Sequence, residues 1–159
     1  MNMPDHAATA SVERPLTTRD GLATRFREVR ATTERLCAPL EIEDYVVQSM
    51  PDASPAKWHL AHTSWFFETF LLKPSRRGLA ASPDEYAYLF NSYYNALGER
   101  IARNKRGLIS RPTVKEIYQY RETVDAQILE LLESSDEKVL DEFAPLMALG
   151  LNHEQQHQE

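Results

Sequence analysis

The sequence predicts an all-α protein folded as a bundle of four helices. Apolar residues recur at the three- and four-residue spacing of amphipathic helices along much of the chain. Alternating, strand-like patterns are scarce, and the 159 residues include only 5 glycines. This length is that of one ordinary domain, which is large enough to bury a hydrophobic core of its own.

The first helix is expected to begin at Thr17 or Thr18, because threonine is a good N-cap residue. Apolar residues then recur at helical spacing up to Pro39, where the helix should end. Residues 1–16 mix Ala, Thr and Pro without the apolar segment of a secretory signal, so we interpret them as a disordered tail. The sequence thus predicts one helical, metal-binding domain over residues 17–159.

A second helix is predicted to begin with Ser54 as its N-cap and Pro55 in its first turn, where a missing N–H costs nothing. On a helical wheel its apolar stripe contains His62, whereas His59 lies further round, towards two phenylalanines. Residues 74–111 then form a long crossover rich in aromatic and basic residues. A segment of this length inside a compact domain is usually functional or contains short helices, so we expect it to be packed.

Two more helices are predicted after the crossover. Thr113, followed three residues later by Glu116, forms a capping-box pattern that places the start of the third helix there. The fourth helix is expected to begin near Asp141, with Pro145 in its first turn. Its stripe comprises Leu146, Leu149, Gly150, His153 and His157. Within it, Gly150 is expected to permit the close approach of a neighbouring helix or to leave room beside the histidines.

The composition limits the classes of function. Hydrophobic residues make up 42% of the chain and charged residues 26%, which are values of a globular protein. The net charge of −6, without a dominant basic patch, argues against a nucleic-acid partner. No apolar run approaches the roughly 18 residues needed to cross a bilayer. The lone cysteine, Cys37, excludes an internal disulfide and fits a cytoplasmic location.

The pattern that points to chemistry is the pair His153 and His157, because residues four apart lie on one face of a helix. His62 can face the same interior from the second helix. Burying three imidazoles without a partner would be costly, so the three together favour a metal site. The alternatives are a core histidine at 62 and a solvated helix end at 153–157, and His59 is the less favoured ligand. Imidazole suits Zn²⁺ but also Fe, Ni and Cu, so ligand type does not identify the metal.

Other polar residues have two interpretations each. Arg100, Arg103 and Arg106 either clamp a carboxylate or form a solvated basic loop. Glu154 points about 100° away from His153 on the wheel, so it is expected behind the ligands or facing solvent. The sequence assigns a catalytic role to none of these residues.

Four separated segments resemble the N-terminal DinB-like domain of the EgtB family, the sulfoxide synthases of ergothioneine biosynthesis. They occur in the family's order and span nearly the whole region from Thr17 to Glu159. The segments are SPAKWHLAH (54–62), FNSYYN (90–95), RGLISRP (106–112) and LGLNHEQQHQE (149–159). The resemblance implies a DinB-like four-helix bundle with a long crossover between its second and third helices.

In that family three histidines hold Fe(II), and the enzyme uses O₂ to join a cysteine-type thiol to hercynine. Carried over by position, the ligands would be His62, His153 and His157. Gln156 resembles a position that helps to hold the hercynine imidazole, and Arg100 and Arg103 resemble arginines that bind carboxylates of the thiol substrate. The substrates implied are therefore hercynine, O₂ and either cysteine or γ-glutamylcysteine.

Family members continue past the last motif into a formylglycine-generating-enzyme-like domain, which these 159 residues lack. The resemblance therefore implies a chain truncated before its second domain, and we expect it to form no sulfoxide alone. Two alternatives stay open. One is a stand-alone DinB-like thiol transferase that uses Zn²⁺ or another divalent ion, and the other is a non-catalytic helical interaction module.

Overall fold

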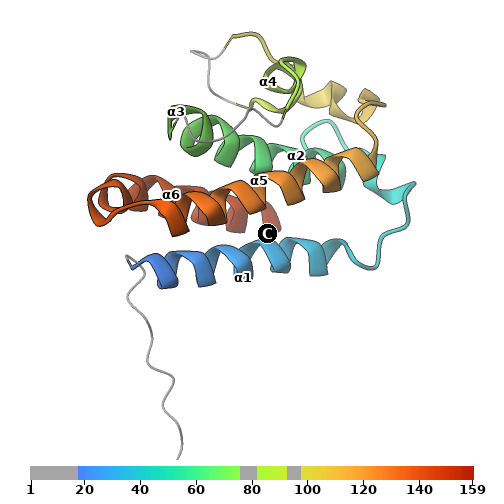
Figure 1. Ribbon diagram of the computed structural model, residues 1–159. Coiled ribbons are helices and arrows are strands. Elements are labelled where there is room, and N and C mark those ends of the chain that lie inside the picture. Colours follow the sequence, from blue (N-terminus) through green and yellow to red (C-terminus); the bar gives the residue numbers. More distant parts are fainter. Residues whose placement is uncertain (1–17, 76–81, 93–97) are drawn as a thin grey trace, which may run out of the picture.

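The computed structural model of the chain (Figure 1) describes residues 18–75, 82–92 and 98–159. These described residues form helices and connections without a strand, which confirms the predicted all-α class. The tail predicted at residues 1–16 lies outside them. Among the described helices, none is long and apolar enough to cross a membrane.

Four long helical segments of the described chain build the bundle. They are α1 (Arg19–Cys37), α2 (Ala56–Phe67) with its continuation, α5 (Val114–Ser134) and α6 (Glu137–Gln158). The continuation of α2 is a π-helical segment, η2 (Glu68–Leu72), followed by the short α3 (Lys73–Ser75). In the bundle α1 packs mainly against α6, and α2 packs mainly against α5.

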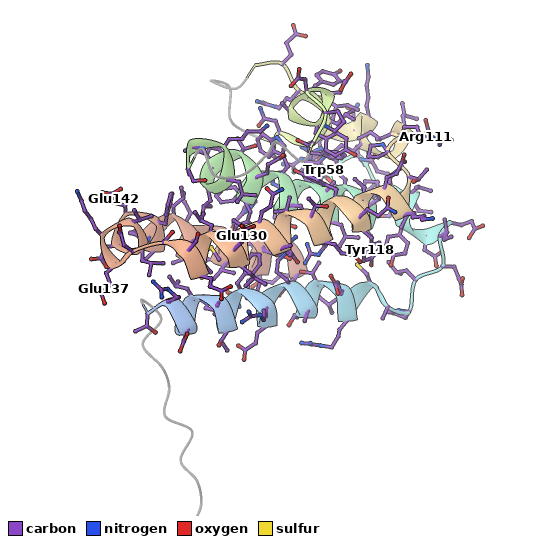
Figure 2. All side chains as sticks on the ribbon, in the orientation of Figure 1. Trp58, Arg111, Tyr118, Glu130, Glu137 and Glu142 are labelled. Atoms are coloured by element: carbon purple, nitrogen blue, oxygen red, sulfur yellow. The ribbon has the colours of Figure 1, made fainter. Side chains whose placement is uncertain are left out.

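The long connection between α3 and α5 crosses back over the bundle, so α2 and α5 run in the same direction (Figure 1). It carries α4 (Glu85–Phe90) and the 3₁₀ segment η4 (Arg103–Leu108), while a shorter 3₁₀ turn, η1 (Asp44–Val46), lies between α1 and α2. The Trp58 indole N–H donates to the Leu89 carbonyl oxygen at 2.9 Å, and Figure 2 shows Trp58 where α2 meets this crossover. The described part of the crossover around Leu89 is therefore packed, as predicted.

The start signals of the helices were predicted with mixed success. The Thr18 hydroxyl accepts a hydrogen bond from the Gly21 N–H at 3.2 Å, and Thr113 forms the predicted capping box with Glu116. The prediction of Ser54 as an N-cap is wrong, because Pro55 occupies that position. The Ser54 hydroxyl instead accepts a hydrogen bond from the Arg106 guanidinium at 2.9 Å.

The fourth helix begins earlier than predicted. The Asp136 carboxylate accepts a hydrogen bond from the Val139 N–H at 2.9 Å, so α6 begins at Glu137 rather than near Asp141. Pro145 consequently lies inside the helix, and Leu149, predicted on the buried stripe, is 55% exposed. The buried residues of α6 are Leu140, Ala144, Met147, Gly150, Leu151 and Glu154.

Gly150 brings α6 into close contact with α2, as one of its two predicted roles requires. A Cβ atom built at Gly150 would lie 2.6 Å from Cε1 of Phe67 and 3.0 Å from Cε1 of Phe66. Both rings are buried, with Phe67 in the main hydrophobic core. A residue with a side chain at this position would therefore force the two helices apart one turn before His153.

Replacing Gly150 by Ala should destabilise the protein. At an exposed helical position this change gains about 1 kcal/mol, but overpacking of a dense core costs about 1 to 3 kcal/mol. We therefore expect a net loss in the free energy of unfolding, measured with urea. Leu149→Ala, at the neighbouring exposed position, should change that energy by less than about 0.5 kcal/mol. A gain in stability for Gly150→Ala would contradict the close packing.

Candidate metal centre

The three histidines singled out in the sequence meet inside the bundle. His62 comes from α2, whereas His153 and His157 lie one turn apart on α6. Each offers a ring nitrogen, and these nitrogens lie within 4.8 Å of one another. The Nε2 atom of His153 is 3.1 Å from Nε2 of His62 and 3.1 Å from Nε2 of His157.

The orientation of the His62 ring is fixed by its surroundings. Its side chain is only 1% exposed, and its Nδ1 lies 2.6 Å from the Phe90 carbonyl oxygen. Because a carbonyl oxygen only accepts, Nδ1 must carry the hydrogen, and Nε2 therefore presents a lone pair to the other histidines. The Trp58 ring stacks on His62 with centroids 4.5 Å apart and holds the ring from one face.

The contacts of His153 fit a bound cation better than an ordinary hydrogen-bond network. Nε2 of His153 contacts Nε2 of both His62 and His157, but a ring nitrogen can donate or accept only one hydrogen bond. One of the two contacts is therefore not a hydrogen bond in the absence of an ion. Its Nδ1 is buried and has no hydrogen-bond partner among the described residues. Three nitrogens bound to one ion at about 2.0 to 2.1 Å lie roughly 3 Å apart. The donor set and the two 3.1 Å contacts of His153 therefore fit a divalent metal ion, and all three nitrogens lie within 4.8 Å of one another.

The environment keeps these imidazoles in the neutral form that binds metals. Burial is the largest cause that lowers the pKa of His62 well below its usual value, and the neighbouring His157 and His153 add to it. Burial, followed by the charges of His153 and His59, lowers the pKa of His157 to about 3. Burial also lowers the pKa of His153, against an opposing effect of the Glu154 carboxylate.

The three crossover arginines have different environments. Arg106 is 4% exposed, and its guanidinium carbon lies 3.5 Å from the centroid of the Trp58 ring that stacks on His62. This excludes the solvated-loop interpretation for Arg106. Arg100 and Arg103 are exposed on the crossover, and Gln156 is exposed on α6 beside His157. The substrate-binding roles of these last three residues stay predictions.

Glu154 is the residue for which the sequence analysis was least informative. It is 0% exposed, so the solvent-facing alternative is wrong. Its carboxylate accepts hydrogen bonds from Arg121 at 2.7 Å, from Arg30 at 2.9 Å and from Thr33 at 2.6 Å. Burial raises the pKa of this carboxyl, but the two guanidinium charges and the hydrogen bonds outweigh that effect and lower the pKa to about 2.

A signal for this cluster is present in the sequence. Arg30 follows Phe26 by four residues on the buried stripe of α1, and Arg121 follows Ile117 by four residues on that of α5. Two arginines on apolar stripes need a buried acidic partner, because a buried charge is stable only when it is paired. Glu154, between two candidate ligands, supplies the shared carboxylate.

His59 also contacts the centre, which the helical wheel did not indicate. Its Nδ1 lies 2.7 Å from Nδ1 of His157, on the side of the His157 ring that faces away from His153. The wheel had placed His59 towards phenylalanines of its own helix. It could not place the side chain against α6, because a wheel describes one helix without its neighbours.

One comparison with known proteins gave a match. The sequence model of the DinB superfamily matches residues 25–159, which include most of α1, every later helix and all three candidate ligands. No curated protein gives a significant match to the chain.

Proposed function

The chain belongs to the DinB superfamily, and from this we propose that it binds one divalent metal ion through His62, His153 and His157. Members of this superfamily generally bind metals and are often metal-dependent enzymes. The observation that carries the proposal is that Nε2 of His153 lies 3.1 Å from Nε2 of both His62 and His157. The Phe90 carbonyl oxygen supports it, because it turns the Nε2 lone pair of His62 towards the other two rings.

We further propose that the ion is Fe(II) and that the domain serves a cytoplasmic, O₂-dependent sulfoxide synthase that joins a cysteine-type thiol to hercynine. The four segments that resemble the EgtB family support this finer assignment. Bound iron would supply the activation of O₂. Of the chain's own residues, Gln156 would orient the hercynine imidazole, and Arg100 and Arg103 would bind substrate carboxylates.

A second candidate function is a Zn²⁺-dependent thiol transferase, since three neutral imidazoles also suit zinc. The two functions differ in their need for O₂. Oxygen uptake that depends on both hercynine and a thiol would support the sulfoxide synthase. Thiol conjugation with a Zn²⁺-loaded protein in the absence of O₂ would support the transferase. A helical module without a metal is the third candidate, and metal titration tests it directly.

The metal site is tested by titrating metal-depleted protein with Fe(II) under anaerobic conditions, and with Zn²⁺ in parallel. We expect one ion per chain for the wild type. His62→Ala removes a buried ligand and should weaken binding by more than the 10- to 100-fold that is typical for a residue behind the ligands. His6→Ala, a histidine change in the predicted tail, serves as the control and should bind like the wild type.

The same titration can contradict the proposed metal site. Equal affinities of the wild type and His62→Ala would exclude this centre. An ion that also stabilises the folded state should raise the free energy of unfolding, by about 4 kcal/mol when the metal is present at 1,000 times its Kd. His62→Ala should lose that increment at the same metal concentration.

A further inference from the structure

We propose that His59 is a positioning residue that holds His157 in the tautomer whose Nε2 lone pair faces the metal. This inference rests on the proposed metal site, and it adds a fourth histidine with a different task. His59 lies on α2, one turn before His62, and is partly buried. It is the fourth imidazole of the described bundle that contacts the cluster.

The two nitrogens of His157 have different partners. Nε2 lies 3.1 Å from Nε2 of His153, whereas Nδ1 lies 2.7 Å from Nδ1 of His59. A contact of 2.7 Å between two ring nitrogens is a hydrogen bond, which requires that one nitrogen donates and the other accepts. The direction of this one bond therefore decides which nitrogen of His157 carries the hydrogen.

The tautomer of His157 that can bind a metal requires one direction of this bond. A neutral imidazole has one N–H, so a lone pair on Nε2 of His157 requires the hydrogen to be on Nδ1. His157 must then donate to His59, and Nδ1 of His59 accepts. The hydrogen of His59 is thereby assigned to its Nε2.

His59 acts on His157 as the Phe90 carbonyl acts on His62. In both cases an acceptor behind the ring receives a hydrogen bond from the Nδ1–H group, so that Nε2 faces the centre. Such partners of metal-binding histidines set the tautomer and the ring orientation. His59 does not belong to the group of histidines whose nitrogens converge in the described residues, and its Nδ1 is engaged on the far side of the His157 ring. Its position therefore fits an acceptor for His157 rather than a fourth ligand.

The tautomer can be measured without any metal. A long-range ¹H–¹⁵N correlation spectrum of metal-free, ¹⁵N-labelled protein at pH 7 distinguishes a protonated Nδ1 from a protonated Nε2 for each histidine. We expect His157 to carry its hydrogen on Nδ1. In His59→Leu the His157 signals should shift towards the Nε2-protonated pattern. A wild-type His157 with its hydrogen on Nε2 would overturn the inference.

The consequence for the metal is tested with Co²⁺, whose visible absorption reports the ligand geometry. His59→Leu keeps the bulk but removes the acceptor, and should bind Co²⁺ about 10- to 100-fold more weakly with an altered spectrum. His59→Asn places an amide oxygen near the position of Nδ1, and should recover affinity to within about threefold of the wild type with an unaltered spectrum. Circular dichroism shows whether each variant folds, and His59→Ala replaces the Leu variant if that one does not.

The possible results separate this inference from the metal site itself. If the wild type binds Co²⁺ and both His59 variants bind equally well, the inference is wrong and the metal site stands. If Asn and Leu both lose as much affinity as His62→Ala, His59 is a ligand and the inference is again wrong. If the wild type binds no metal, the proposed function fails, and the role of His59 fails with it.

Discussion

Replacing Glu154 by Gln should lower the free energy of unfolding by about 3 to 5 kcal/mol. The carboxylate is fully buried between the guanidinium groups of Arg30 and Arg121. Removing its charge leaves two buried cations with one acidic partner fewer, which costs far more than the loss of a surface pair. Arg30 retains Asp125 at 2.7 Å, but the remaining carboxylate near Arg121 is that of Glu34, which lies 3.4 Å away and is 48% exposed.

The loss of stability should therefore come mainly from the buried guanidinium group of Arg121, which keeps no close, buried carboxylate. Urea unfolding at pH 7 measures it, with Glu142→Gln as the matched change on the same helix. Glu142 is exposed at the far end of α6, where Figure 2 shows it pointing away from the bundle. That control should change stability by less than about 0.5 kcal/mol. A loss below about 1 kcal/mol for Glu154→Gln would mean that the two guanidinium groups find other partners or water.

Glu154 also connects stability to the candidate centre, because it lies between the two histidines of α6. Its partners Arg30 and Thr33 belong to α1, and Arg121 belongs to α5. The same turn of α6 thus faces α2 with imidazoles and faces α1 and α5 with a carboxylate. This fixes the rotation of α6 about its axis, and with it the direction in which His153 and His157 point.

Much of this arrangement could be predicted from periodicity and local signals. The capping residues Thr18 and Thr113 mark helix starts, because their bonds are made within four residues of chain. The stripe of α2 correctly placed His62 in the interior, because α2 is buried on nearly every side. The three-histidine cluster followed from two such stripes, and the structure brings its members together.

What could not be predicted depends on contacts between helices. The charge cluster joins side chains 33 to 124 residues apart in the sequence, so the local pattern indicates two buried arginines but not the carboxylate that they share. The contact between His59 and His157 spans 98 residues. The early start of α6 was missed for a different reason: Asp136 lies in a polar run before the apolar stripe from which this helix was predicted, although aspartate is a strong N-cap. Long-range pairing sets these features, while the local pattern sets only which face each residue occupies.

The metal-free protein should lose stability as the pH falls from 7 to 5. The pKa of His157 is about 3 in the folded state and about 6.5 in an unfolded chain. Below pH 6.5 His157 therefore binds a proton in the unfolded state but stays neutral in the folded state. Its contribution to stability is present above pH 6.5 and is lost as the pH falls towards 3. His157 alone should cost about 2 kcal/mol at pH 5.

Burial lowers the pKa of His62, His59 and His153 as well, so their contributions have the same sign and the total loss should exceed that of His157. Urea unfolding in the presence of a chelator, at pH 7 and pH 5, measures the loss. His157→Gln should show a smaller difference between the two pH values, whereas His6→Ala should not. Glu154 does not interfere, because its lowered pKa confines its own loss to pH values below about 4.5. Equal stability at pH 7 and pH 5 would mean that the histidines are hydrated in the metal-free protein, and that the closed, neutral cluster forms only around an ion.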